Sequence, residues 1–308
     1  STKAKVDADG GSLTLKVIVK DANFNWLTWK NISVKYIDPR IVQKQLKAVI
    51  DEANSYYTHS TDNEAGTAKA AYKAVIDAAQ SNYESAIIDD MNQSMADLAA
   101  AYKVYALSGA MPEEGYPFDL TYTLTNPSFS NNNADGWDVI SNPQFQSYGN
   151  AEYYMSNFDI SQTIKNLPKA YYKLKVKAFQ RPGFADTVIP NYVKAEDKAD
   201  GTANVNAEIY VNSGSQLIKN AAYTMRTTAL GGNESTNEVN GNTYYIPNDM
   251  ETAGKYFDAG YYENEIELIC TTGEAKMGIR CVDGTGAGYW TIFDDFRLYM
   301  TKEVDLAA

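Results

Sequence analysis

Residues 274–300 read EAKMGIRCVDGTGAGYWTIFDDFRLYM, and this stretch decides the fold class of the chain. Apolar residues alternate with polar ones up to Cys281, a polar turn follows, and a second alternating run begins at Trp290. An alternation with a period of two places apolar side chains on one face of a strand and polar side chains on the other. The stretch therefore predicts two half-buried β-strands.

A second copy of this pattern lies near the other end of the chain. Residues 12–36 read SLTLKVIVKDANFNWLTWKNISVKY and align without a gap, so that Trp26 corresponds to Trp290. Self-similarity of this kind is typical of tandem modules. A long β-rich region precedes only the later copy. We therefore expect residues 1–37 to be the two-strand tail of a preceding β-sandwich repeat. Because two strands are marginal alone, we expect them to pair with another domain or chain.

The composition and charge exclude several classes of function. The 308 residues include 27 Lys and Arg against 39 Asp and Glu, which gives a net charge of −12. A negative field repels phosphate backbones, so we expect no nucleic-acid partner. No apolar run approaches the length of a bilayer span, so we expect no membrane insertion. The chain has one histidine, His59, which excludes most Ser-His-Asp arrangements and all multi-histidine metal sites.

The two cysteines, Cys270 and Cys281, are expected to be free and buried. The strands that carry them flank a Thr-Thr-Gly-Glu turn and are expected to form a hairpin. In that hairpin Cys270 faces Ala275 and Cys281 faces Asn264, so the sulfurs lie on the order of 20 Å apart. This separation is too large for a disulfide bond.

Residues 38–110 have the period of helices. Asp38-Pro39 is typical of a helix start. Apolar residues then recur at helical spacing in three runs, with Asp90 expected to cap the third helix and Gly109 to end it. The runs are Val42, Leu46, Val49, Ile50, Ala53 and Tyr57; Ala68, Tyr72, Val75, Ala79 and Tyr83; and Met91, Met95, Leu98, Tyr102 and Tyr105. This pattern predicts a small three-helix bundle.

A linker at residues 111–117 separates these helices from a region of short strands at 118–303, where the helical period disappears. In YYKLKVKAF, residues 171–179, apolar residues alternate with lysines. This predicts a strand with one face packed on the core and the other face exposed to solvent. The polar stretch at 229–242 is expected to be a mobile loop. The strand candidates are LTYTLTN, AEYYMSN, ISQTIKN, YYKLKVKAFQ, NAEIYVN, TYYI, YYENEIELIC, AKMGIRC and FDDFRLYM. The predicted fold class is multi-domain α+β, a three-helix bundle followed by an antiparallel β-sandwich.

Short motifs in a set order then suggest a family. They are Asn126-Pro127-Ser128-Phe129, Gly136-Trp137, Ala151-Glu152, Phe158-Asp159-Ile160-Ser161-Gln162-Thr163-Ile164, Leu167-Pro168, Tyr172-Lys173-Leu174 with Ala178-Phe179-Gln180-Arg181, Ile246-Pro247-Asn248 with Phe257-Asp258-Ala259-Gly260-Tyr261-Tyr262-Glu263-Asn264, and Trp290-Thr291-Ile292-Phe293-Asp294-Asp295-Phe296-Arg297-Leu298. Their order resembles the jelly-roll carbohydrate-binding modules with a galactose-binding-like fold that occur in surface and secreted proteins of Bacteroidetes. Residues 38–110 resemble the three-helix spacer modules found in various architectures. Where the family has a glycine after the Leu-Pro turn, Lys169-Ala170 stand here.

Related modules bind structural calcium with a carboxylate after the first Phe and with the closing Asp-Asp pair. Ser130 stands at the first of these positions, so one charged ligand is missing. Asp294 shares the parity of Phe296 and Leu298 and is expected to point inward. Two interpretations stay open: a calcium ion held by Asp294 and by backbone carbonyls near Ser128, or backbone amides that satisfy the carboxylate. No other cofactor is expected.

Candidate sugar-binding residues lie in the long insertions. An aromatic ring packs against the apolar face of a pyranose, while amide, carboxylate and guanidinium groups bind its hydroxyls. On this ground we select Arg181, Tyr192, Tyr244 and Tyr289, with packing within the loops as the alternative for each. Trp290 recurs at the position of Trp26 and is expected to belong to the core.

The resemblance implies a non-catalytic glycan-binding segment of a secreted or cell-surface modular bacterial protein, with a polysaccharide as its partner and the helices as a spacer. Two alternatives stay open: an ancillary region of a glycoside hydrolase, or the hydrolase itself, and a purely structural spacer. Carboxylates are abundant, but none lies in a motif that indicates acid–base catalysis. We therefore predict no enzymatic activity.

Overall fold

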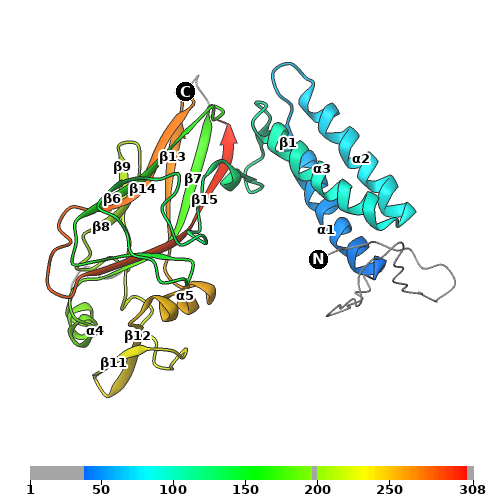
Figure 1. Cartoon of the computed structure of the whole chain (residues 1–308). Helices are drawn as coiled ribbons and strands as arrows, with labels where there is room; N and C mark the ends of the chain where they lie inside the picture. Colours follow the sequence, from blue (N-terminus) through cyan, green and yellow to red (C-terminus); the bar gives the residue numbers. More distant parts are fainter. Residues whose placement is uncertain (1–37, 196–199, 304–308) are drawn as a thin grey trace, which may run out of the picture. The chain divides into compact units, whose positions relative to one another are not determined.

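The computed structural model describes residues 38–195 and 200–303. The chain divides into two compact units, residues 1–38 and 39–308, and the elements described below belong to the second. The two strands expected within residues 1–37 lie outside the described residues. Together the helices and sheets form an α+β fold that contains a β-sandwich (Figure 1).

Three helices come first, at the places where the helical period predicts them. They are α1 (Pro39–Thr58), α2 (Ala68–Ser85) and α3 (Ile88–Ala106). Each helix buries one apolar stripe, which includes Leu46 of α1, Ile76 of α2 and Leu98 of α3. The expected cap of the third helix is wrong: α3 starts after Ile87, and Asp90 lies in its first turn. A carboxylate there still stabilises the helix, because it faces the positive end of the helix dipole.

One short strand pairing, with one hydrogen bond beside it, ties the helices to the segment that follows them. β1 (Ser60–Thr61), between α1 and α2, pairs with β2 (Met111–Pro112), which follows α3. Beside this pairing, the hydroxyls of Ser60 and Tyr105 share a hydrogen bond of 2.6 Å. The loop between the first two helices is therefore held against the chain that leads into the sheets.

The sandwich consists of two sheets. In the first, the order is β10-β7-β15-β3, with β13 also paired to β7 and β5 to β15; in the second, the order is β4-β6-β14-β8-β9. Only the β10–β7 pairing is parallel among these described strands. The strands of the first sheet are β3 (Phe118–Asp119), β5 (Ala151–Tyr154), β7 (Ala170–Arg181), β10 (Lys219–Asn220), β13 (Glu263–Cys270) and β15 (Trp290–Glu303). Those of the second are β4 (Asp138–Ile140), β6 (Phe158–Lys165), β8 (Ala207–Val211), β9 (Gly214–Leu217) and β14 (Glu274–Cys281).

The expected hairpin between the two cysteine-bearing strands is wrong. β13 pairs with β7 in the first sheet, whereas β14 pairs with β6 and β8 in the second. The short connection therefore crosses from one sheet to the other, and the apolar faces of both strands point into the space between the sheets. Alternation alone fits both arrangements, since each gives one buried face per strand. Cys270 and Cys281 are free and buried, as predicted.

Other expectations fail at segments that cover the sandwich. Thr121–Thr123 is a 3-10 helix rather than part of a strand. The stretch expected to be a mobile loop contains β11 (Glu234–Val239), which pairs with β12 (Asn242–Pro247). Two helices, α4 (Ala185–Lys194) and α5 (Met250–Asp258), lie in the region where no helix was expected. Both are short, with about three turns at most, so a helical period has little room to show.

These added segments build a second hydrophobic core on the outer face of the first sheet. Phe179, Trp290 and Ile292 of the sheet pack there against α4 and α5. Figure 1 shows α4, α5, β11 and β12 gathered at one end of the sandwich. The helix residues in this core include Val188, Ile189 and Tyr192 of α4 and Met250, Ala253, Tyr256 and Phe257 of α5. The first sheet is therefore covered on both faces at this end.

Candidate functional site

An open hollow lies around Tyr289, the residue immediately before β15. The hollow has a volume of about 450 Å³. Its other walls come from Pro182, which follows β7, from the end of α4 with Ala195 after it, and from the loop before β8. The lining residues are Pro182, Asn191, Lys194, Ala195, Asn204 and Tyr289. The ring of Tyr289 is half-buried, while Asn191, Lys194 and Asn204 are exposed.

Two glycines position Tyr289. A Cβ atom on Gly286 would lie 2.5 Å from the Tyr289 ring, so the bare backbone lets the ring lie against the loop. Gly288 has a φ of +79°, and a Cβ there would lie 2.5 Å from the backbone nitrogen of Phe184. Only glycine fits both that backbone conformation and that close approach. The backbone carbonyl of Tyr289 also accepts a hydrogen bond from Met155 N–H at 2.8 Å.

The residue types of this hollow suit a polar ligand with one flat apolar face. The Tyr289 ring supplies a flat carbon surface. The amides of Asn191 and Asn204 each offer a donor and an acceptor, and the ammonium of Lys194 offers three donors. The sequence alone selected Tyr289 but missed the other three. Their residue types are common in exposed loops, so only the fold distinguishes them.

Arg181 and Tyr192 lie inside the protein rather than in this hollow. Arg181 is 7% exposed, donates a hydrogen bond from Nη1 to Oδ1 of Asn248 at 2.7 Å, and lies over the Trp290 ring at 5.0 Å. Tyr192 is 4% exposed within the second core. These positions favour the packing alternative for both residues.

Arg181 belongs to a buried polar cluster with Glu152 and Trp290. Trp290 lies opposite Arg181 on one neighbouring strand and opposite Tyr154 on the other. Its indole N–H donates to Oε2 of Glu152 at 2.5 Å. Burial raises the pKa of Glu152, against the lowering effects of the Trp290 hydrogen bond and the Arg181 charge. Burial likewise lowers the pKa of Arg181. The opposite charges of this cluster therefore favour each other's ionised form.

Tyr244 lies on β12, opposite Asn237 of β11. It is half-buried and packs against the second core. It is not among the residues that line the hollow of Tyr289. The structure therefore does not bring the four candidates together into one site.

Asp294 is half-buried, and its Oδ1 accepts the backbone N–H of Asp295 at 2.6 Å. Burial raises the pKa of Asp294 to about 7, although this hydrogen bond lowers it. The neighbouring Asp295 is paired with Lys177 at 3.0 Å. Within residues 38–195 and 200–303, no group of three or more His, Cys, Asp or Glu side chains lies in a position to hold a metal ion. These side chains do not fit a calcium site built from several carboxylates. The hydrogen bond from the Asp295 backbone N–H agrees with the interpretation that backbone amides satisfy the Asp294 carboxylate.

No protein-family model matches the chain, and no curated protein matches it. Among solved structures, the carbohydrate-binding module TmCBM61 in complex with β-1,4-galactotriose is similar at 16% identity and a TM-score of 0.29, over 58% of this chain and 97% of that one. In the described part of the chain, no helix is both long and apolar enough to cross a membrane.

Two further solved structures are similar over parts of larger proteins. The secreted serine protease VesC from Vibrio cholerae has 11% identity and a TM-score of 0.21, over 54% of this chain and 25% of that one. The family GH115 4-O-methyl-α-glucuronidase BtGH115A, with specificity for decorated arabinogalactans, has 10% identity and a TM-score of 0.27, over 86% of this chain and 34% of that one. Similarities of this size assign neither a family nor a function to the chain.

Proposed function

We propose that this chain binds a glycan, without cleaving it, in the hollow around Tyr289. One observation carries the proposal: a half-exposed aromatic ring lies beside two side-chain amides and an ammonium in an open hollow. A pyranose has an apolar face that packs on such a ring and hydroxyls that pair with amides. The hollow is open, so it suits a residue within a longer polysaccharide as well as a free sugar.

The way the glycine backbone holds the Tyr289 ring favours a role in ligand binding over a role in loop packing alone. Gly288 lies against Gly183 and Phe184, and the ring of Tyr289 lies against Gly286, so the ring is held in place before a ligand arrives. A site that is ordered in advance loses less conformational entropy on binding. Lys194 is the one charged residue among the six that line the hollow, so an acidic sugar is favoured over a basic one.

The proposal includes the finer architecture that the motif order implies. In it, residues 118–303 are a galactose-binding-like jelly roll, residues 38–110 are a three-helix bundle that acts as a spacer, and residues 111–117 link them. The protein is secreted or displayed on a bacterial cell surface, where a polysaccharide is accessible. A structural calcium ion held by Asp294 and by backbone carbonyls near Ser128 also stays a proposal, tested below.

Glycoside hydrolysis is the second candidate function, and one observation favours it. Glu152, whose pKa is raised by burial, lies near Asp249, whose pKa is lowered by hydrogen bonds from Thr252. Two neighbouring carboxyl groups whose pKa values are shifted in opposite directions are typical of glycosidases. Both groups are occupied here, since Glu152 accepts from Trp290 and Asp249 caps α5. Turnover of chromogenic glycosides that is lost in Glu152→Gln would establish hydrolysis in place of binding alone.

Affinity electrophoresis against a panel of neutral and acidic polysaccharides tests the binding proposal. We expect at least one polysaccharide to retard the chain, and Tyr289→Ala to weaken its binding about tenfold, which is near 1.4 kcal/mol. Tyr148→Ala is the matched control, because Tyr148 is 47% exposed and lies outside the hollow. Absence of retardation across the panel, or equal losses in the two variants, would contradict the proposal.

A further inference from the structure

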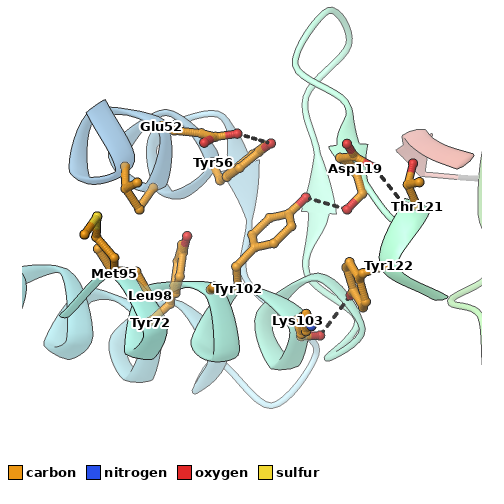
Figure 2. Close-up of a pocket in the computed structure, with 13 residues that line it drawn as sticks. Glu52, Tyr56, Tyr72, Met95, Leu98, Tyr102, Lys103, Asp119, Thr121 and Tyr122 are labelled. Atoms are coloured by element: carbon orange, nitrogen blue, oxygen red, sulfur yellow. Dashed lines mark hydrogen bonds between the residues drawn. The ribbon is translucent and has the colours of Figure 1, made fainter. Parts of the chain in front are cut away.

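A second cavity lies between the three long helices and the chain that enters the sandwich (Figure 2). Its volume is about 360 Å³, which is within the usual range for small-molecule sites. α1, α2 and α3 form most of its wall, and Asp119, Thr121 and Tyr122 close one side. None of its lining residues belongs to the hollow of Tyr289.

Aromatic and aliphatic carbon makes up most of this wall. Four tyrosine rings line the cavity together with aliphatic side chains from α1 and α3. The lining residues of this kind are Val49, Ala53, Tyr56, Tyr72, Met95, Leu98, Ala99, Tyr102 and Tyr122. Figure 2 shows Tyr56 of α1 facing Met95, Leu98 and Tyr72 across the space. Such a wall suits a planar apolar ligand, because ring faces and edges pack well against other rings.

Hydrogen bonds hold three of the rings in place. Tyr56 donates to Oε1 of Glu52 at 3.0 Å, and Tyr102 donates to the backbone carbonyl of Asp119 at 3.1 Å. Tyr122 donates to the backbone carbonyl of Lys103, also at 3.1 Å. Tyr56 and Tyr102 also stack with a centroid distance of 4.4 Å. The hydroxyl hydrogen bonds therefore fix the orientation of three of the four rings that line the cavity.

The charged groups of the lining favour a cation. The carboxylates of Glu52 and Asp119 lie on two sides of the cavity, against one ammonium, that of Lys103. That ammonium lies over the Tyr122 ring, 5.4 Å from its centroid. Burial and the nearby carboxylates raise the pKa values of Tyr56 and Tyr102, so both hydroxyls stay neutral. The net charge of the lining is therefore negative, and the faces of neutral tyrosine rings attract cations.

We propose that this cavity binds a small planar aromatic molecule that carries a primary ammonium. The ring lies between Tyr56 and the apolar side chains of α3, and the ammonium pairs with Glu52 at the exposed edge. Because three helices and residues 119–122 all line the cavity, such a ligand also stabilises the contact between these segments. This site is independent of glycan binding.

Three indole compounds that differ mainly in charge test the proposal on the full chain. Isothermal titration calorimetry compares tryptamine, which is cationic, with neutral tryptophol and anionic indole-3-propionate. We expect saturable one-site binding of tryptamine, at least about fivefold tighter than that of tryptophol, and no binding of the propionate. Failure of tryptamine to bind, or equal affinity for all three compounds, would overturn the proposal.

Two pairs of variants locate the binding. Glu52→Gln removes the acceptor charge and should reduce the advantage of tryptamine over tryptophol to about twofold or less. Glu64→Gln, at an exposed position outside the cavity, should leave that advantage unchanged. Ala99→Trp fills the rim and should abolish binding of both compounds, whereas Ala96→Trp, on the same helix but outside the lining, should not. Tryptamine binding that survives both Glu52→Gln and Ala99→Trp unchanged would place it elsewhere and refute the assignment.

Discussion

The two halves of β7 differ, although they belong to one strand. From Ala170 to Lys177, buried residues alternate with half-buried ones, whereas the four residues from Ala178 to Arg181 are all buried. The first half has the sandwich core on one face and water on the other. The second half lies between the sandwich core and the second core, which α4 and α5 build.

The second half shows how a strand buried on both faces can still carry polar side chains. A strand covered on both faces usually reads as an apolar run, yet this segment reads AFQR. Its polar residues find most of their hydrogen-bond partners inside the protein, and only Nε of Arg181 has none. Gln180 donates to Oγ1 of Thr291 at 3.2 Å and accepts the backbone N–H of Asn206 at 2.8 Å. Arg181 is bound to Asn248. Buried polar groups with partners do not weaken a core as unpaired ones do.

The largest expected effect concerns the doubly covered half. Phe179→Ala removes a ring that is 0% exposed and packs against Tyr262 and Trp290. We expect a loss of about 3–5 kcal/mol in the free energy of unfolding, because the rigid surroundings leave a cavity. Urea unfolding followed by circular dichroism measures this loss. A loss below about 1 kcal/mol would show that the second core does not hold this end of the strand.

The next effect concerns the charge of Arg181. Arg181→Met keeps apolar volume over Trp290 but leaves Glu152 buried without its positive neighbour, so we expect a loss of about 2 kcal/mol near neutral pH. The same change at Arg280, whose pair with Glu208 is at the surface, should cost less than about 1 kcal/mol. The two losses are compared by urea unfolding of each variant.

The pH dependence of the Arg181 variant provides the sharper test. The pKa of Glu152 is raised in the folded protein and should rise further without Arg181. A raised carboxyl pKa destabilises the folded state as the pH rises above the ordinary range of Glu, and has no effect where the group is protonated in both states. The loss should therefore be smaller at about pH 4.5 than near pH 7. A loss that does not change with pH would separate the role of Arg181 from the charge of Glu152.

A smaller effect is expected at Asp294, which lies opposite Lys177 where the two halves meet. Its pKa is raised to about 7 by burial, so the folded state binds its proton more tightly than the unfolded state. Stability from this group falls as the pH rises from about 4 to about 7 and is then constant. Asp294→Asn should remove that fall and stabilise the protein at neutral pH, by about 1–2 kcal/mol, because solvent at the half-buried side chain reduces the cost of burying the charge.

The same Asp294 variant tests the calcium proposal. Thermal unfolding is measured in calcium and in a chelator. If calcium binds at Asp294, the metal raises the melting temperature of the original chain but not that of Asp294→Asn. Equal melting temperatures in both solutions, together with the stabilised variant, would support backbone amides as the partners of this carboxylate.

The smallest effect is expected in the half of β7 from Ala170 to Lys177, where one face is exposed to solvent. Lys175 pairs with Glu263 at 2.7 Å, but both side chains are partly exposed. Lys175→Ala should change the free energy of unfolding by about 0.5 kcal/mol or less, since solvent and salt screen such pairs. A loss comparable to that of Phe179→Ala would show that the two halves do not differ energetically.

The sequence alone determined the elements whose burial is periodic. The helix from Pro39 and the strand through Tyr172, Leu174 and Val176 were predicted, because a buried stripe leaves a regular apolar pattern. The free state of Cys270 and Cys281 was also predicted, although from a hairpin that does not exist. A local pattern records that one face is buried, and says nothing of which segment buries it.

Only the tertiary structure decided which candidates face solvent. Arg181, Tyr192 and Tyr289 were selected on the same ground, yet the first two are buried and Tyr289 lines the hollow. Tyr192 is buried because α4 packs over the outer face of the first sheet, whereas Arg181 lies against Asn248 and Trp290. The hollow itself combines residues from 182–195, Asn204 and Tyr289, which lie far apart in the chain. Exposure is a property of such long-range packing, and no local periodicity encodes it.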